Sequence, residues 1–127
     1  MYQLSGEHLD QWMKGYKSAW EGRIAEEAVR LFTDNAEYYE SPFSEPACGS
    51  KSIMDFWQDV PILQTNVSFE YQILFIKEAI GYVHAHGRFM RLASGEEVTM
   101  DGIFEVHFAE NGRCDLFRQW WHEKTEL

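Results

Sequence analysis

The side chains best suited to proton transfer in this sequence include a close pair of histidines. His84 and His86 are two residues apart, so on a β-strand both rings would project to the same face. A histidine titrates near neutral pH and can act as a general acid or base. We expect this role for His86 if its ring reaches a ligand, and otherwise a partly buried or solvent-facing histidine. The residues that alternate with the two histidines form an apolar row: Val83, Ala85, Gly87 and Phe89. Because this row should face the helices, we expect both histidine rings to point away from them.

A second candidate for acid/base chemistry is Glu40, which precedes Pro42 at the end of a predicted strand over residues 35–41. A carboxyl group that loses contact with water has a raised pKa and can act as a base. Tyr39, Phe43 and Trp57 are the residues expected to desolvate it. The alternative is a solvent-exposed glutamate in an acidic protein.

The residues that would position a ligand lie in a long ribbon near the C-terminus. Residues 98–123 alternate with period two on either side of Asn111-Gly112, a pair that predicts a tight hairpin turn with positive φ at both positions. One face carries Met100, Phe104, Phe117, Gln119 and Trp121. The other face carries Ile103, Glu105, Leu116, Arg118, Trp120 and His122. Because each face has a tryptophan beside a polar group, we do not expect either face to be simply exposed to solvent.

The first face of the ribbon is predicted to line a ligand pocket. The expected pocket residues are Tyr16, Trp20, Tyr39, Phe43, Phe56, Trp57, Met100, Phe104, Phe117, Gln119 and Trp121. The Gln119 amide could hydrogen-bond a polar atom of the ligand. It could equally be a core glutamine bonded to a neighbour such as Tyr16.

The second face is predicted to form a homodimer. Leaving the Trp120 ring in water would expose about 200 Å² of surface, worth roughly 5 kcal/mol as an upper estimate. Two-fold dimers are the commonest oligomers. We therefore expect a dimer contact through Ile103, Glu105, Leu116, Arg118, Trp120 and His122.

The elements that must hold these residues form one domain over residues 1–127. A helix is predicted from a cap at Ser5 to Gly22, a second over residues 24–32, and a third from a cap at Ser50 to Pro61. Further strands are predicted over residues 66–76 and 81–91, before the ribbon. The order α-α-β-α-β-β-β-β predicts an α+β fold with three helices on one face of a strongly curved mixed or antiparallel sheet.

Composition narrows the choice of partner. The chain has 11 Lys and Arg against 21 Asp and Glu, a formal net charge of −10, which argues against nucleic acid and anionic membranes. A small apolar or neutral molecule fits better, and we expect no cofactor. No metal is expected either, because no further histidine or cysteine has the spacing to join the histidine pair. Without a signal peptide or spanning segment, the chain is expected in the cytoplasm with Cys48 and Cys114 reduced.

Several short motifs together resemble the SnoaL-like branch of the nuclear transport factor 2-like superfamily. They are Tyr16 and Trp20, residues 31–36, residues 41–43 with Gly49, Phe56-Trp57, residues 101–104, and residues 112–114 through Trp120-Trp121. The resemblance implies a cone-shaped fold with a ligand pocket at its open end and an outer sheet face that often makes a dimer. It leaves function open, because such folds host isomerases, cyclases, dehydratases and binding domains.

Ketosteroid isomerase, a member of this superfamily, uses a carboxylate base with a tyrosine and a protonated aspartic acid as oxyanion donors. By resemblance, Tyr16 matches the tyrosine, Glu40 or Ser41 matches the base, and Phe104 stands where the acid would be. Because phenylalanine cannot donate a hydrogen bond, steroid isomerisation by that constellation is not expected. We expect a binding protein with proton-transfer activity of isomerase, cyclase or dehydratase type. The alternatives are a non-catalytic binding or sensor protein and a dimeric accessory subunit.

Overall fold

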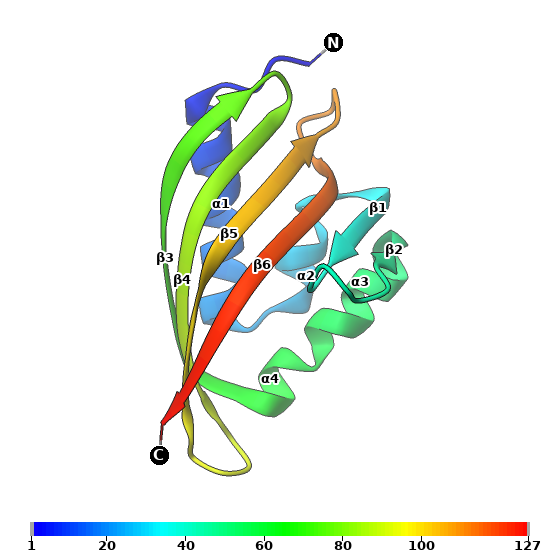
Figure 1. Cartoon of the computed structure of the whole chain (residues 1–127). Helices are drawn as coiled ribbons and strands as arrows, with labels where there is room; N and C mark the ends of the chain where they lie inside the picture. The colour runs from blue at the N-terminus through cyan, green and yellow to red at the C-terminus, as the bar shows by residue number, and fades with distance from the viewer. Residues whose placement is uncertain (1, 127) are drawn as a thin grey trace.

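The fold is a curved six-stranded sheet with its helices gathered on one side (Figure 1). The computed structural model describes residues 2–126. Its elements are α1 (Gly6–Gly22), α2 (Ala25–Val29), β1 (Phe32–Tyr39), β2 (Ala47–Cys48), α3 (Gly49–Gln58), α4 (Val60–Leu63), β3 (Gln64–Lys77), β4 (Ile80–Arg91), β5 (Glu97–Phe108) and β6 (Cys114–Glu126).

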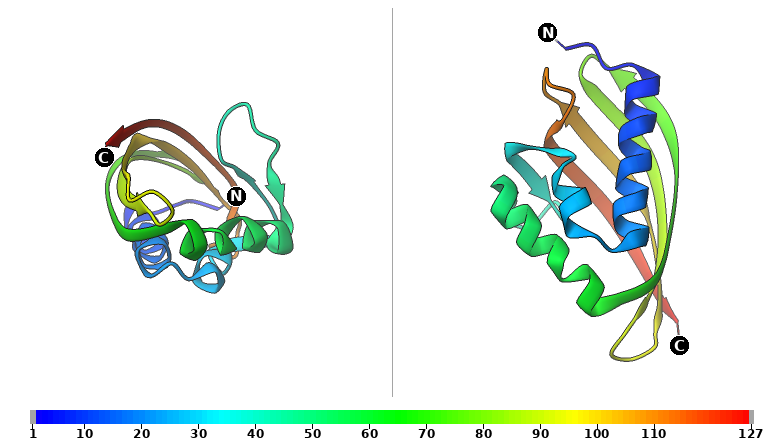
Figure 2. Two further views of the ribbon diagram at one scale, coloured as in Figure 1. Left: turned by 90° about the horizontal axis from the view of Figure 1, so that it is seen from below. Right: turned by 180° about the vertical axis from the view of Figure 1, so that it is seen from behind.

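The strands lie in the order β2-β1-β6-β5-β4-β3. Only the pair β1 and β6 is parallel among the described strands, so the sheet is mixed. Seen end on, the sheet curls over the helices (Figure 2). The predicted α+β fold and its element order are confirmed, with the short β2 and α4 added. No helix within residues 2–126 has the length and apolar character needed to cross a membrane.

Helix α1 begins and ends as predicted. The Ser5 side chain accepts a hydrogen bond from the His8 backbone N–H at 3.0 Å, which caps the first turn. Gly22 is the last helical residue, and the residue after it, Arg23, takes the left-handed conformation, with φ of 55°. The buried face carries Leu9, Trp12, Met13, Tyr16, Ala19 and Trp20. This apolar face packs into the curve of the sheet and brings Tyr16 and Trp20 to its inner side.

The boundaries around β1 and α3 depart from the prediction. Phe32 opens β1 rather than closing the second helix, and β1 ends at Tyr39 instead of continuing to Ser41. The N-cap of α3 is Cys48, with no side-chain hydrogen bond, instead of Ser50. Pro61 lies in the first turn of α4, where a missing backbone N–H costs little.

The C-terminal ribbon forms with the predicted inner and outer faces but with a different turn. In β5 and β6, Phe104 pairs with Gln119 and Gly102 pairs with Trp121. Gly112 has φ of 83°, but Asn111 does not have positive φ, so the tight two-residue turn was wrong. The connection is longer: the Asn111 side chain accepts from the Arg113 backbone N–H at 2.9 Å.

Candidate functional site

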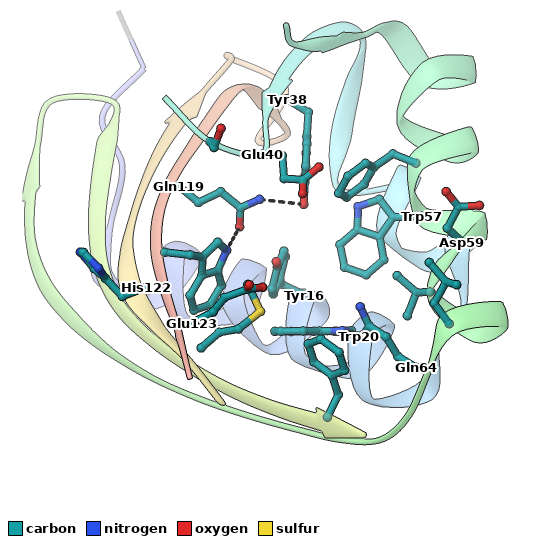
Figure 3. Close-up of a pocket in the computed structure, with 17 residues that line it drawn as sticks. Tyr16, Trp20, Tyr38, Glu40, Trp57, Asp59, Gln64, Gln119, His122 and Glu123 are labelled. Atoms are coloured by element: carbon teal, nitrogen blue, oxygen red, sulfur yellow. Dashed lines mark hydrogen bonds between the residues drawn. The ribbon is translucent and has the colours of Figure 1, made fainter. Parts of the chain in front are cut away.

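A cavity of about 630 Å³ opens between α1, α3, α4 and the inner face of the sheet (Figure 3). Its walls are largely aromatic: Tyr16, Trp20, Tyr38, Phe56, Trp57, Phe89 and Trp121. The other lining residues are Glu40, Ser41, Asp59, Val60, Leu63, Gln64, Met100, Gln119, His122 and Glu123. A concave, mostly apolar site with a few polar groups is the usual form of a small-molecule site.

The polar groups gather at one end of the cavity, which we call the polar end: Tyr16, Tyr38, Trp57, Gln119 and Trp121. The Gln119 side chain is 4% exposed and is held from both sides. Its Nε2 donates to the Tyr38 hydroxyl oxygen at 3.5 Å, and its Oε1 accepts from Trp121 Nε1 at 2.5 Å. Gln119 therefore borders the cavity and is bonded to neighbours at the same time, with Tyr38 in the place expected for Tyr16.

The two tyrosine hydroxyls of the polar end remain protonated. Burial raises the pKa of Tyr16 well above its ordinary value, and the neighbouring Tyr38 raises it further. Burial also raises the pKa of Tyr38. The donors of Tyr16, Gln119 and Trp57 oppose that rise, while the charge of Glu40 adds to it. Both groups are thus neutral hydrogen-bond donors at physiological pH.

Trp57 contributes a donor from α3, across the cavity from the sheet. Its side chain is 2% exposed, and its indole Nε1 has no hydrogen-bond partner. The N–H faces the Tyr38 hydroxyl (Figure 3) and opposes the rise in the pKa of Tyr38, but it does not reach that oxygen with ordinary hydrogen-bond geometry. Trp20 differs, because its Nε1 donates to Gln64 Oε1 at 2.8 Å.

Three exposed carboxylates border the cavity: Glu40, Asp59 and Glu123. Among the described residues, no lysine or arginine lines it. Figure 3 shows the Glu40 side chain beside Tyr38 at the polar end, and of the three carboxylates Glu40 is the one whose charge raises the pKa of Tyr38. Its exposure corresponds to the alternative of a solvent-exposed glutamate, because Phe43 is 99% exposed and does not cover it.

Seven of the predicted pocket residues line the cavity together with Glu40: Tyr16, Trp20, Phe56, Trp57, Met100, Gln119 and Trp121. Four others do not border it. Phe104 and Phe117 are fully buried beneath it, and Phe43 points into solvent from the loop after β1. Tyr39 points to the other face of the sheet, where the Arg118 guanidinium carbon lies 5.3 Å from the centre of its ring.

The inward-facing residue of β1 is Tyr38, which sequence reasoning missed. Its side chain alternates with that of Tyr39, and Ala36 and Tyr38 form the buried row of the strand. The apolar spacing of Ala36 and Tyr38 was the available signal. Sequence reasoning also did not select Asp59, Val60, Leu63, Gln64, Phe89 or Glu123 for the cavity, and it named Ser41 only as a possible match to the isomerase base.

His86 lies on the outer face of the sheet, away from the cavity. Asp101 joins it to His84: the His84 Nε2 lies 2.9 Å from one carboxylate oxygen, and the His86 Nδ1 lies 3.0 Å from the other. Hydrogen bonds from His84 and then His86 lower the pKa of Asp101. Val83, Ala85, Gly87 and Phe89 occupy the inner row of β4, which turns the histidines outward. Among the described residues, no cluster of histidine, cysteine or acidic side chains could hold a metal ion.

The predicted dimer residues lie on the outer row of β5 and β6: Ile103, Glu105, Leu116, Arg118, Trp120 and His122. Trp120 is 38% exposed. His122 also borders the cavity, although its ring points away from the polar end (Figure 3). The alternation of β6 thus separates Gln119 on the inner face from Arg118 and Trp120 on the outer face.

Comparison with solved structures finds the same fold in proteins of low sequence identity. A "Putative Isomerase from Bacillus subtilis" is 15% identical with a TM-score of 0.81, and the match covers 91% of this chain and 87% of that one. The "epoxide hydrolase/cyclase-like enzyme SalBIII" of salinomycin pyran ring formation is 13% identical with a TM-score of 0.78, covering 89% of each chain. A "putative aromatic ring hydroxylase from Novosphingobium aromaticivorans" is 17% identical with a TM-score of 0.73, covering 94% of this chain and 92% of that one.

At these identities the structural likeness shows a shared fold and does not assign an activity. No curated protein sequence matches the chain. The model of the SnoaL-like domain, however, matches residues 13–116, which include most of α1, the strands β1 to β5 and most of the cavity wall. The chain therefore belongs to the SnoaL-like domain family.

Proposed function

We propose that this protein binds a small, mostly apolar, neutral molecule and moves a proton on a carbon atom next to a ligand oxygen. The observation that carries the proposal is the pairing of the polar end with Glu40. Neutral donors from Tyr16, Tyr38 and Trp57 meet at one end of an aromatic cavity, and a carboxylate lies beside them. Donors for a developing negative oxygen and a base for the adjacent carbon are the two requirements of this chemistry.

The proposed step starts with a carbonyl oxygen at the polar end. The Glu40 carboxylate takes a proton from the neighbouring carbon, and the electron pair of the broken C–H bond forms a carbon–carbon double bond. The carbonyl π electrons move onto the oxygen, which becomes an enolate held by the donors. Return of the proton to a different carbon gives isomerisation. Attack of the enolate carbon on a second carbonyl of the same molecule, with the proton passing from Glu40 to the alkoxide that forms, gives cyclisation.

The charge of the cavity favours a neutral ligand. Glu40, Asp59 and Glu123 are all acidic, and no lysine or arginine lines the cavity within the described part of the chain. The chain as a whole has a formal net charge of −10. A ligand carrying a carboxylate or phosphate would be repelled on approach and would find no positively charged partner.

The comparisons support this class of reaction. Two similar folds belong to proteins described as a "Putative Isomerase" and as an "epoxide hydrolase/cyclase-like enzyme". The family match over residues 13–116 includes Tyr16, Glu40 and Trp57.

The test uses β-tetralone, a neutral bicyclic ketone with exchangeable protons beside its carbonyl. In deuterated buffer, the protein is expected to accelerate replacement of those protons, with a rate that saturates as the ketone concentration rises. Proton NMR follows the exchange directly. Bovine serum albumin at the same concentration controls for non-specific binding and surface carboxylates. An exchange rate equal to that of the albumin control would contradict the catalytic proposal.

A non-catalytic binding protein is the second candidate, favoured by the exposure of Glu40 and by Phe104. An exposed carboxylate is in contact with water, and Phe104 supplies no proton at the position that resembles an isomerase acid. Saturable binding of β-tetralone without accelerated exchange would support this candidate.

We further propose that the protein forms a homodimer through the outer face of the sheet. Trp120 is 38% exposed, and Phe75, 56% exposed, stacks on Tyr82 with ring centres 4.6 Å apart on the same face. Ile103 lies beside Trp120 in the β5–β6 register. Burying these groups against a second copy would remove apolar surface from water.

Replacing Trp120 by glutamate is expected to dissociate this dimer and leave β-tetralone binding intact. The introduced charge would be buried without a partner at the contact, whereas the ring of Trp120 faces away from the cavity. Sedimentation velocity at micromolar concentration measures the change. Glu110→Gln, in the exposed loop between β5 and β6, serves as a surface control. A monomeric wild-type protein, or loss of binding with the dimer retained, would refute the assignment.

A further inference from the structure

We propose that the indole N–H of Trp57 is the donor that binds the acceptor oxygen of the ligand. This inference rests on the proposed function and narrows it to ligands with a carbonyl-type oxygen on an apolar body. The role belongs to α3, an element that sequence reasoning treated only as part of an apolar wall.

The first support is that the Trp57 donor is buried and unpaired. Trp57 is 2% exposed, yet its Nε1 has no hydrogen-bond partner. Buried polar groups in proteins nearly always have a partner, so an unpaired donor requires an explanation. Here the explanation is available, because Trp57 lines the cavity and a bound molecule can supply the missing acceptor.

The other tryptophans near the cavity and core are paired, which makes Trp57 distinctive. Trp12 Nε1 donates to the Leu31 carbonyl at 2.9 Å, Trp20 Nε1 donates to Gln64, and Trp121 Nε1 donates to Gln119. The Thr33 hydroxyl is also buried without a partner, but it does not border the cavity. Trp57 therefore combines an unmet donor with a side chain that borders the cavity.

The second support is the position of the N–H among the other polar groups. It faces the Tyr38 hydroxyl across the cavity from Gln119 (Figure 3). The Trp57 ring packs edge-on against Tyr16, with ring centres 5.5 Å apart and an interplanar angle of 85°. That packing fixes the direction of the N–H bond before a ligand arrives, as preorganised stabilisation of a developing oxyanion requires.

The third support is the absence of a donor at Phe104, which is fully buried. By resemblance, an isomerase of this superfamily places an acid there. In this chain, Trp57 can supply a further donor in addition to the two tyrosine hydroxyls, from α3 on the opposite wall of the cavity. A tryptophan N–H only donates and carries no charge, so it could donate to a neutral carbonyl oxygen or to an enolate oxygen without changing its own protonation.

The experiment compares two probes of nearly the same shape in three proteins. The probes are β-tetralone and the hydrocarbon in which a methylene group replaces its oxygen. The proteins are the wild type, Trp57→Phe and Trp20→Phe. Trp20→Phe is the matched control, because it shortens another cavity tryptophan whose N–H is already paired with Gln64. Isothermal titration calorimetry gives the affinity of each protein for each probe.

The wild type is expected to prefer the ketone by roughly tenfold, as for one net hydrogen bond. Trp57→Phe should reduce this preference to what the tyrosine hydroxyls contribute and keep its affinity for the hydrocarbon, whereas Trp20→Phe should retain the full preference. An undiminished ketone preference in Trp57→Phe would overturn the inference. So would an equal loss of affinity for both probes, because that result would indicate packing alone.

A second readout keeps the inference testable if Trp57→Phe folds poorly. In isotope-labelled wild-type protein, the indole N–H proton resonance of Trp57 should move downfield on binding the ketone and much less on binding the hydrocarbon. Equal shifts with the two probes would overturn the role of Trp57 while leaving cavity binding in place. If neither probe binds the wild type, the proposed function fails together with the inference.

Discussion

Replacing Glu40 by glutamine is expected to slow the exchange of β-tetralone protons by about 10²–10⁴-fold, the usual contribution of a general base. The amide keeps the shape of the side chain but is a very poor base. Because Glu40 lies at the cavity border beside Tyr38, the affinity for the ketone should change little. Exchange measured by proton NMR at saturating ketone, with affinity measured by calorimetry, separates the two effects.

Asp59→Asn is the matched control for Glu40→Gln. It removes one negative charge from the same cavity border but follows α3 instead of adjoining the polar end. Its exchange rate should remain close to that of the wild type. If both variants slow exchange equally, the total negative charge at the cavity border determines the exchange rate, and Glu40 has no special role. If Glu40→Gln exchanges as fast as the wild type, Glu40 is not the base.

The largest effect on stability is expected from Gly102→Ala. A Cβ atom at Gly102 would lie 1.9 Å from the Trp120 carbonyl oxygen and 3.0 Å from the Trp121 Cα. These are backbone atoms of the paired strand, so they cannot move aside without separating β5 from β6. Overpacking typically costs 1–3 kcal/mol and sometimes more, and we expect at least about 3 kcal/mol here. Urea denaturation measures the change in the free energy of unfolding.

Gly6→Ala provides the control for Gly102→Ala. It makes the same chemical change at the start of α1, where nothing lies within 4 Å of the added Cβ. Alanine favours helix by up to about 1 kcal/mol, so this variant should be as stable as the wild type or slightly more stable. Equal effects of the two substitutions would show that close strand approach at Gly102 is not what limits stability.

The overall fold followed from patterns that depend on short stretches of chain. The capped apolar stripe of α1 and the period-two alternation of β3 to β6 predicted the element types and their order, because one side of each element must be buried. Turn details were less predictable. Asn111-Gly112 favours a tight turn, but the Asn111 side chain bonds to Arg113 within a longer loop.

The cavity was only partly predictable, because its lining depends on which way each strand residue faces at the end of a curved sheet. Gln119 and Trp121 were chosen through the alternation of β6, and both line the cavity. Tyr38 and Tyr39 are adjacent tyrosines, and the sequence-based choice favoured Tyr39 although Tyr38 faces inward. Phe43 was chosen for its apolar ring, but the loop after β1 holds it in solvent.

The sequence could not show which buried donors find a hydrogen-bond partner. Nothing in the local pattern distinguishes Trp57, which lacks a partner, from Trp20, whose N–H reaches Gln64 across 44 positions of chain. Such pairs depend on how α1, α3 and β3 pack together. For the same reason, the sequence could place Glu40 at a strand end but not beside the Tyr38 hydroxyl.

A crystal structure of the complex with β-tetralone is the most direct test of the central claim. We expect the ketone in the cavity with its oxygen within hydrogen-bond distance of Trp57 Nε1 and the Tyr38 hydroxyl. The Glu40 carboxylate should face the carbon next to the carbonyl. A ketone bound with its oxygen toward the open side, with no carboxylate beside that carbon, would contradict the account.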